Sequence, residues 1–220
     1  MKIEHISRIT QQLHHVKSHI SLSGETEYAV LIPLVEKDDK LFLLFEKRSK
    51  TVRQPGEICF PGGQMDATDT SLEEAALREM VEEIGIVKKA ILPLGKLGVL
   101  YNGAMILHCF VGFIYEKDLP LTVFNPAEVE ELLLVDLDEL IKIKPSHYKI
   151  KLYADPTDVD EMGNVVTLFP GKELKLPERY HGRWHMGYRD IITYDLGEEL
   201  IWGMTGKIVE RFLMLFKGIN

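Results

Sequence analysis

The sequence predicts an α/β fold in which helices flank a mixed β-sheet. Two features predict it: β-rich runs occur in pairs around polar turns, and two amphipathic helical segments lie at residues 71–84 and 205–216. A length of 220 residues, with 45% hydrophobic and 27% charged residues, is enough for a sizeable core in a soluble globular protein.

The first elements are a helix and a hairpin. Residues 3–20 carry apolar side chains every three or four positions, which predicts an amphipathic helix. Residues 28–35 and 41–45 are β-rich runs joined by a polar turn. Residues 58–60 form a short apolar strand that leads directly into Pro61, Gly62 and Gly63.

The central helix has clear start and stop signals. Thr70 or Ser71 can cap its first turn, with Glu73 or Glu74 three residues further on as the capping-box partner. Gly85 stands where the helix is expected to end.

The second half of the chain predicts more strands and a final helix. Residues 91–101 and 104–115 form strands around Asn102-Gly103, a strong signal for a tight hairpin. We expect a strand at 130–135, a short helix at 136–141, strands at 191–194 and 200–202, and a helix at 205–216. The pattern is weak from 144 to 189. We therefore predict a single domain over residues 1–220, with a helical extension at 1–25, a core at about 27–142 and 190–217, and an insertion at 144–189.

Composition limits the cellular setting and the partners. A net charge of −8 argues against general nucleic-acid affinity, which requires a basic surface. The two cysteines, Cys59 and Cys109, lie in apolar runs and are interpreted as reduced core residues. We see no signal segment and no run of membrane-spanning length, so we expect a cytoplasmic protein with no membrane partner.

Three carboxylates in the central helix point to a metal site. Glu79, Glu82 and Glu83 are spaced i, i+3 and i+4, which places them on one helix face about one turn apart. Like charges at this separation repel each other, whereas a hard divalent cation such as Mg²⁺ binds carboxylate oxygens and keeps positions open for phosphate.

Residues 78–86 read REMVEEIGI and resemble the second half of the Nudix box, R-E-U-x-E-E-x-G-U with U apolar, at every position. The resemblance implies a Nudix hydrolase with an α/β/α sandwich, which cleaves a nucleoside diphosphate linked to another group and uses Mg²⁺ or Mn²⁺.

The first half of the box departs from the general pattern. The loop from Gly63 to Arg78 is one residue longer than usual, and Asp69 replaces a Glu whose family role is to pair with the Arg. We assign Asp69, Arg78 and Gly85 structural roles in the box.

Residues 43–63, LLFEKRSKTVRQPGEICFPGG, resemble the signature of the coenzyme A pyrophosphatase subfamily, as do the IWGMT run at 201–205 and the spacing of Asp66 and Asp69 after the glycine pair. Val52 stands where Leu is usual. This resemblance implies hydrolysis of CoA or a CoA derivative to 3′,5′-ADP and 4′-phosphopantetheine or its acyl form.

The resemblance also implies roles for individual residues. Glu79, Glu82 and Glu83 would hold the metal. The carbonyl of Gly62 or Gly63 could add a ligand, because glycine lets the backbone approach closely. Arg48 and Arg53, with Gly62 and Gly63, would bind substrate, since arginine matches phosphate geometry. The general base is left open: Glu82 and Glu57 are preferred, and three downstream glutamates (Glu128, Glu130 and Glu131) are further candidates.

Other functions are kept as alternatives. A Nudix pyrophosphatase could act on ADP-ribose, dinucleotides or damaged nucleotides, and a non-catalytic Nudix domain could bind a ligand. Residues 179–189 are rich in arginine and aromatic side chains and could bind an adenine ring and a 3′-phosphate. Alternatively, they could pack within the protein or form a homodimer contact.

Overall fold

The computed structural model describes residues 26–103, 105–119 and 124–218. The predicted helix at 3–20 and the extension at 1–25 lie outside the described residues. The main sheet has the strand order β3-β2-β1-β6-β5, with β4 paired to β1 and β7 paired to β2. Its strands are β1 (Thr26–Lys37), β2 (Lys40–Arg48), β3 (Ile58–Cys59), β4 (Gly62–Gln64), β5 (Ile91–Tyr101), β6 (Met105–Tyr115) and β7 (Val129–Asp136).

The turns between neighbouring strands follow local rules. Asp38 and Asp39, between β1 and β2, have φ values of 49° and 59°, the left-handed conformation that tight hairpin turns require. The predicted hairpin at Asn102 is also present: the Met105 amide donates to the Asn102 side-chain oxygen at 3.0 Å. Both predicted hairpins are confirmed.

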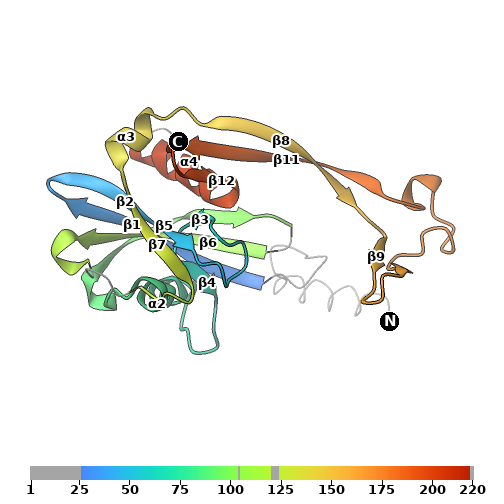
Figure 1. The fold of residues 1–220 in the computed structure, drawn as a ribbon, viewed down its shortest axis with the longest axis horizontal. Helices are drawn as coiled ribbons and strands as arrows, with labels where there is room; N and C mark the ends of the chain where they lie inside the picture. Colours follow the sequence, from blue (N-terminus) through green and yellow to red (C-terminus); the bar gives the residue numbers. More distant parts are fainter. Residues whose placement is uncertain (1–25, 104, 120–123, 219–220) are drawn as a thin grey trace, which may run out of the picture.

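The sheet is mixed, as predicted, because β1 and β6 run parallel in register from Thr26↔Met105 to Glu36↔Tyr115, while the other pairs are antiparallel. Helix α2 (Leu72–Ile84) covers one face, where Ala76, Met80 and Ile84 are fully buried. Helices α3 (Leu137–Lys142) and α4 (Gly203–Phe216) pack on the other face (Figure 1). This arrangement is an α/β sandwich.

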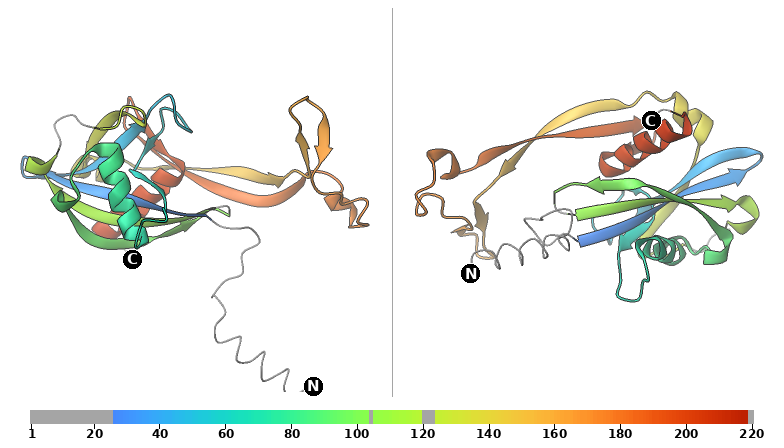
Figure 2. Two further views of the ribbon diagram at one scale, coloured as in Figure 1. Left: turned by 90° about the horizontal axis from the view of Figure 1, so that it is seen from below. Right: turned by 180° about the vertical axis from the view of Figure 1, so that it is seen from behind.

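The insertion is more regular than its sequence pattern predicted. Strands β8 (Ser146–Ala154) and β11 (Trp184–Asp195) pair along nearly their whole length, and β12 (Leu200–Trp202) joins β11 only at residues 193–195. The small hairpin β9 (Thr157–Val159) and β10 (Val165–Thr167) lies at the far end. We call residues 146–193 the arm, because they project away from the sandwich (Figures 1 and 2). The arm gives no alternating apolar signal because most of its side chains are exposed.

The described part of the chain also contains short 3₁₀ turns at Lys88–Ala90, Glu116–Asp118 and Glu178–Tyr180. Among the described residues, no helix is both long and apolar enough to span a membrane.

Candidate active site

Helix α2 starts and ends as its sequence predicts. The Ser71 hydroxyl accepts a hydrogen bond from the Glu74 amide at 3.2 Å, so Ser71 is the cap. Gly85 ends the helix with φ of 78°, a conformation that costs glycine little. The position of the carboxylates along the helix is therefore fixed at both ends.

The loop before α2 is held by an arginine fork. The Arg78 Nε donates to Asp69 Oδ1 at 3.1 Å, and Nη2 donates to Asp69 Oδ2 at 3.0 Å. Nη2 also donates to the Gln64 carbonyl at 3.1 Å. These bonds hold the pKa of Asp69 below its usual value, chiefly through the hydrogen bonds from Arg78. Asp69 thus makes the pairing that we expected in the lengthened loop.

Glu83 is the most buried of the three helix carboxylates. It is 4% exposed, and its Oε2 accepts a hydrogen bond from the Gly62 amide at 2.8 Å. Burial, followed by the charge of Glu46, raises the pKa of Glu83 to about 9. Gly62 therefore contacts this carboxylate through its amide; the role that we predicted for its carbonyl as a metal ligand stays a prediction.

The other two helix glutamates both contact Arg78. Arg78 Nη1 donates to Glu79 Oε1 at 2.8 Å and to Glu82 Oε2 at 2.9 Å. Glu79 lies against Gly63, and burial raises its pKa despite the opposing effect of Arg78. The Glu82 side chain is 53% exposed. The three carboxylates share one side of α2 but differ widely in their access to water.

A fourth carboxylate, Glu46, was not among the predicted site residues. Glu46 lies on β2, is 1% exposed, and accepts a hydrogen bond from the Cys59 thiol at 3.1 Å. Its second oxygen is buried and has no hydrogen-bond partner among the described residues. Burial raises its pKa to about 7, and Arg48 opposes this shift. The one available sequence signal was an acid at the end of a continuous apolar run, followed directly by two cations.

We expect Glu46→Gln to stabilise the metal-free protein at pH 8 by about 3 kcal/mol, since the pKa of Glu46 is raised from 4.5 to about 7. The folded protein keeps the Glu46 proton to a higher pH than the unfolded chain does. The contribution of Glu46 to stability therefore falls as pH rises from 4.5 to about 7. Glutamine does not titrate, so the gain should nearly vanish at pH 4.5. Urea unfolding across this range measures it, with exposed Glu130→Gln as the control. An equal gain at both ends of the range would contradict this explanation.

Only one of the two predicted phosphate-binding arginines reaches the carboxylates. Arg48 Nη1 lies 3.7 Å from Glu46 Oε1, and Arg48 Nε donates to the Arg53 carbonyl at 2.9 Å. The Arg53 side chain is exposed. Glu57 is near the same arginine: burial raises the pKa of Glu57 and the charge of Arg48 lowers it.

The downstream glutamates separate into two environments. Glu128 helps to raise the pKa of Glu46, Glu79 and Glu83, which places its charge near the cluster. Backbone hydrogen bonds join the segment around Glu128 to the end of β2 and to helix α2. The Ser49 amide donates to the Glu128 carbonyl at 2.8 Å, and the Asn125 amide donates to the Glu83 carbonyl at 2.8 Å. Glu130 and Glu131 are exposed on β7, where they act on Lys47.

The donor chemistry of this cluster fits a hard divalent cation. The cluster consists of carboxylates, and the buried Glu46 Oε2 has no hydrogen-bond partner among the described residues. Glycine at position 63 leaves room for the Glu79 carboxylate, because a Cβ there would lie 2.2 Å from Glu79 Oε1. Within the described ranges, however, no three acidic, His or Cys side chains already converge on a common point. Arg78 holds Glu79 and Glu82 in ion pairs, so cation binding requires these side chains to reorient.

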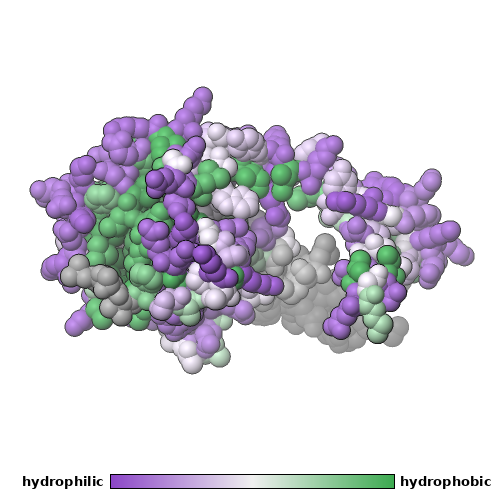
Figure 3. Space-filling view, in the orientation of Figure 1, coloured by the Kyte–Doolittle hydropathy of each residue, from purple (hydrophilic) through white to green (hydrophobic). Residues whose placement is uncertain are grey.

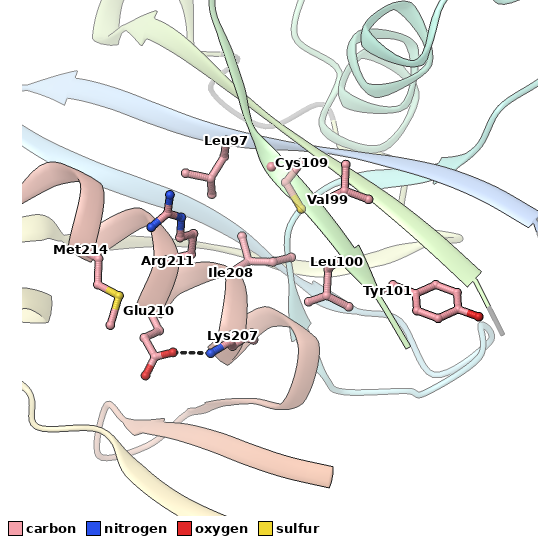
Figure 4. A pocket seen from close by; sticks show the side chains of 11 residues that line it. Leu97, Val99, Leu100, Tyr101, Cys109, Lys207, Ile208, Glu210, Arg211 and Met214 are labelled. Atoms are coloured by element: carbon pink, nitrogen blue, oxygen red, sulfur yellow. Dashed lines mark hydrogen bonds and ion pairs between the residues drawn. The ribbon is translucent and has the colours of Figure 1, made fainter. Parts of the chain in front are cut away.

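An apolar groove lies on the opposite face of the sheet from α2. This groove, of about 410 Å³, runs between β5 and α4, and Figure 4 shows its mainly apolar lining, including Leu97, Leu100 and Met214. The dashed line in Figure 4 marks the ion pair between Lys207 Nζ and Glu210 Oε2, which are 2.7 Å apart. The groove is separated from α2 by the sheet and lacks a carboxylate cluster, so we place the chemistry at α2 instead.

In this α/β sandwich, a glycine pair on β4 precedes the helix that carries the carboxylates. This arrangement indicates a hydrolase. The family comparison agrees: the model described as NUDIX domain matches residues 25–154. The chain belongs to the Nudix family and is a pyrophosphohydrolase, and members of this family generally use divalent metals.

The similar proteins include enzymes from bacteria and animals. An uncharacterized Nudix hydrolase, NudL, of Enterobacter sp. (strain 638) is 40% identical over 203 residues, covering 92% of this chain and 89% of that protein. The peroxisomal coenzyme A diphosphatase NUDT7 of Mus musculus is 36% identical over 123 residues, 55% of this chain and only 50% of the mouse protein. A solved MutT/nudix family protein from Enterococcus faecalis aligns over 96% of this chain and 68% of its own length, at 15% identity and a TM-score of 0.48.

Proposed function

We propose that the protein hydrolyses the pyrophosphate bond of CoA or a CoA derivative, giving 3′,5′-ADP and 4′-phosphopantetheine or its acyl form. The observation that carries this proposal is the position of Arg48. Arg48 belongs to the run at 43–63 that resembles the CoA pyrophosphatase signature, and it lies beside the carboxylate cluster. The similarity to the mouse coenzyme A diphosphatase supports the same substrate class.

In this proposal the glutamates bind the metal, and Arg48 binds the phosphate of the substrate. Glu79, Glu82 and Glu83 would hold Mg²⁺ or Mn²⁺, which neutralises the pyrophosphate and makes bound water more acidic. Arg48 would bind a phosphate oxygen through its guanidinium. Arg53, Gly62 and Gly63 remain proposed substrate contacts, and Arg53 must turn toward the site to make one.

The general base is proposed to be Glu82 or Glu128. Glu82 is exposed at the cluster, and Glu128 is close enough to raise the pKa of Glu79. Glu57 is a weaker candidate, since its neighbouring charge is Arg48. Individual Gln variants of these three residues separate the assignments, because removing the base lowers kcat more than it weakens metal binding.

Incubating the enzyme with CoA and either Mg²⁺ or Mn²⁺ tests the substrate. We expect equal amounts of 3′,5′-ADP and 4′-phosphopantetheine, and no turnover with EDTA. Arg48→Ala should raise KM about tenfold or more by removing a charged hydrogen bond to phosphate. The exposed control Arg53→Ala should have a smaller effect.

A panel containing acetyl-CoA, ADP-ribose, NADH and 8-oxo-dGTP tests the alternatives. Turnover of another member with CoA left intact would overturn the CoA assignment. Binding without turnover of any member would favour a ligand-binding module. We further propose a cytoplasmic location and a small-molecule substrate, without a nucleic-acid or membrane partner.

A further inference from the structure

Glu46 is a buried carboxylate on a strand that is otherwise apolar at this point. It directly follows the buried residues 43–45 of β2 and is 1% exposed. Figure 3 shows hydrophobic side chains over the strands of the sandwich and hydrophilic ones around them, so an acid inside β2 is an exception. Burial of a carboxylate is costly unless its oxygens are hydrogen-bonded or bind a metal. The two oxygens of Glu46 therefore need partners.

Two polar groups contact Glu46, and both act on the same oxygen. The Cys59 thiol donates to Oε1 at 3.1 Å, and Arg48 Nη1 lies 3.7 Å from that same atom. Cys59 is the register partner of Glu46 across β3 and β2, so the pairing of the two strands fixes this contact. The other oxygen, Oε2, is buried and has no hydrogen-bond partner in the described part of the chain. One oxygen of Glu46 is thus held, and the other is left for a ligand.

Glu46 lies on the face of the sheet that α2 covers. Leu44, two residues earlier on β2, packs in the core beneath α2 together with Met80. Alternate residues of a strand share one face, so Glu46 also faces α2. The charges agree with this placement, because after burial the charge of Glu46 is the largest cause that raises the pKa of Glu83. The cluster therefore combines acids from the helix and from the sheet.

The free oxygen of Glu46 is better prepared for a cation than two of the helix carboxylates. Arg78 holds Glu79 and Glu82 in ion pairs, which these side chains must give up to bind a cation. Oε2 of Glu46 has no hydrogen bond among the described residues to lose.

We propose that Glu46 Oε2 is a ligand of the divalent cation, supplied by the sheet, and that Cys59 is the positioning residue that keeps this oxygen free for it. A hard cation binds carboxylate oxygens, removes the repulsion between neighbouring acids and satisfies the buried oxygen that lacks a partner. Hydrogen bonds to the second oxygen of a ligand orient it toward the metal. This inference rests on the proposed metal site at Glu79, Glu82 and Glu83, but not on the substrate.

Titration of the metal-free protein with Mn²⁺, followed by isothermal titration calorimetry without substrate, tests the role of Glu46. Glu46→Gln should raise the dissociation constant of Mn²⁺ about tenfold or more, because glutamine keeps the size of the side chain and loses its charge. The matched control is Glu36→Gln, which removes a partly exposed carboxylate from the neighbouring strand β1 and should leave the constant unchanged. Urea unfolding in EDTA shows whether each variant is folded.

Two variants of Cys59 test the positioning role. Cys59→Ser keeps a donor for Oε1 and should keep the Mn²⁺ affinity of the wild-type protein. Cys59→Val removes the donor and should weaken Mn²⁺ binding about tenfold. Equal affinity of the two variants would overturn the role of Cys59.

Glu83→Gln separates this inference from the metal assignment on which it rests. If Glu83→Gln weakens Mn²⁺ binding and Glu46→Gln does not, Glu46 is not a ligand, and the metal site on α2 stands. If neither variant weakens binding, both assignments fail. An equal loss in Glu36→Gln would show a general effect of charge and would overturn the inference.

Discussion

Glu83→Gln should lower kcat by about 10³-fold or more while the protein still folds. Glu83 is a buried carboxylate at the centre of the cluster, and glutamine keeps its size and can still accept the hydrogen bond from the Gly62 amide. The loss should therefore fall on metal binding and on stabilisation of the transition state. Steady-state kinetics with saturating Mg²⁺ or Mn²⁺ measure the change, and circular dichroism follows the fold.

The same variant should make the metal-free protein more stable at alkaline pH. Folded Glu83 retains its proton up to about pH 9, whereas the unfolded chain releases it near 4.5. The stability of the wild-type protein should therefore fall as pH rises through this window, and the fall should be smaller in Glu83→Gln. Urea unfolding in EDTA measures both slopes.

The control for this variant is Glu73→Gln in the first turn of the same helix. It should leave both kcat and the pH slope unchanged. Near-wild-type turnover of Glu83→Gln would contradict the metal assignment.

Gly63→Ala should lower kcat about 100-fold with little change in stability. A Cβ at this position would lie 2.2 Å from Glu79 Oε1 and 2.5 Å from its carboxyl carbon. Because these atoms end a flexible side chain, the carboxylate can move aside without disturbing the sheet. A displacement of about 1 Å in a reacting group is enough for a loss of this size.

The neighbouring Gly62→Ala provides a matched comparison with the opposite expectation. Its Cβ would lie 2.4 Å from the Ala29 carbonyl oxygen and 2.7 Å from the Val30 Cα, and these backbone atoms cannot move aside without shifting β1. We expect Gly62→Ala to lower the free energy of unfolding by about 2 to 3 kcal/mol. Thermal unfolding and kinetics of the two variants separate the effects. Equal loss of stability in both would show that Gly63 serves the fold and not the position of Glu79.

The local elements of this protein were predictable because short-range chemistry specifies them. The Ser71 cap, the Gly85 terminus and the turn at Asn102 each depend on a few adjacent residues, and the structure has all three. The sheet type followed from the same patterns. The exposure of the side chains did not follow from these patterns. Of the three glutamates spaced for one helix face, Glu83 and Glu79 are mostly buried and Glu82 is exposed.

By itself, the sequence determined the family, the helix that carries Glu79, Glu82 and Glu83, and the pairing of Asp69 with Arg78 in the lengthened loop. Only the tertiary structure placed Glu46 beside Glu83 and brought Glu128 near both. It also turned the weakly patterned insertion into an arm. The reason is physical: caps and turns depend on neighbours along the chain, whereas the burial of a carboxylate and the pairing of β8 with β11 depend on residues that only folding brings together.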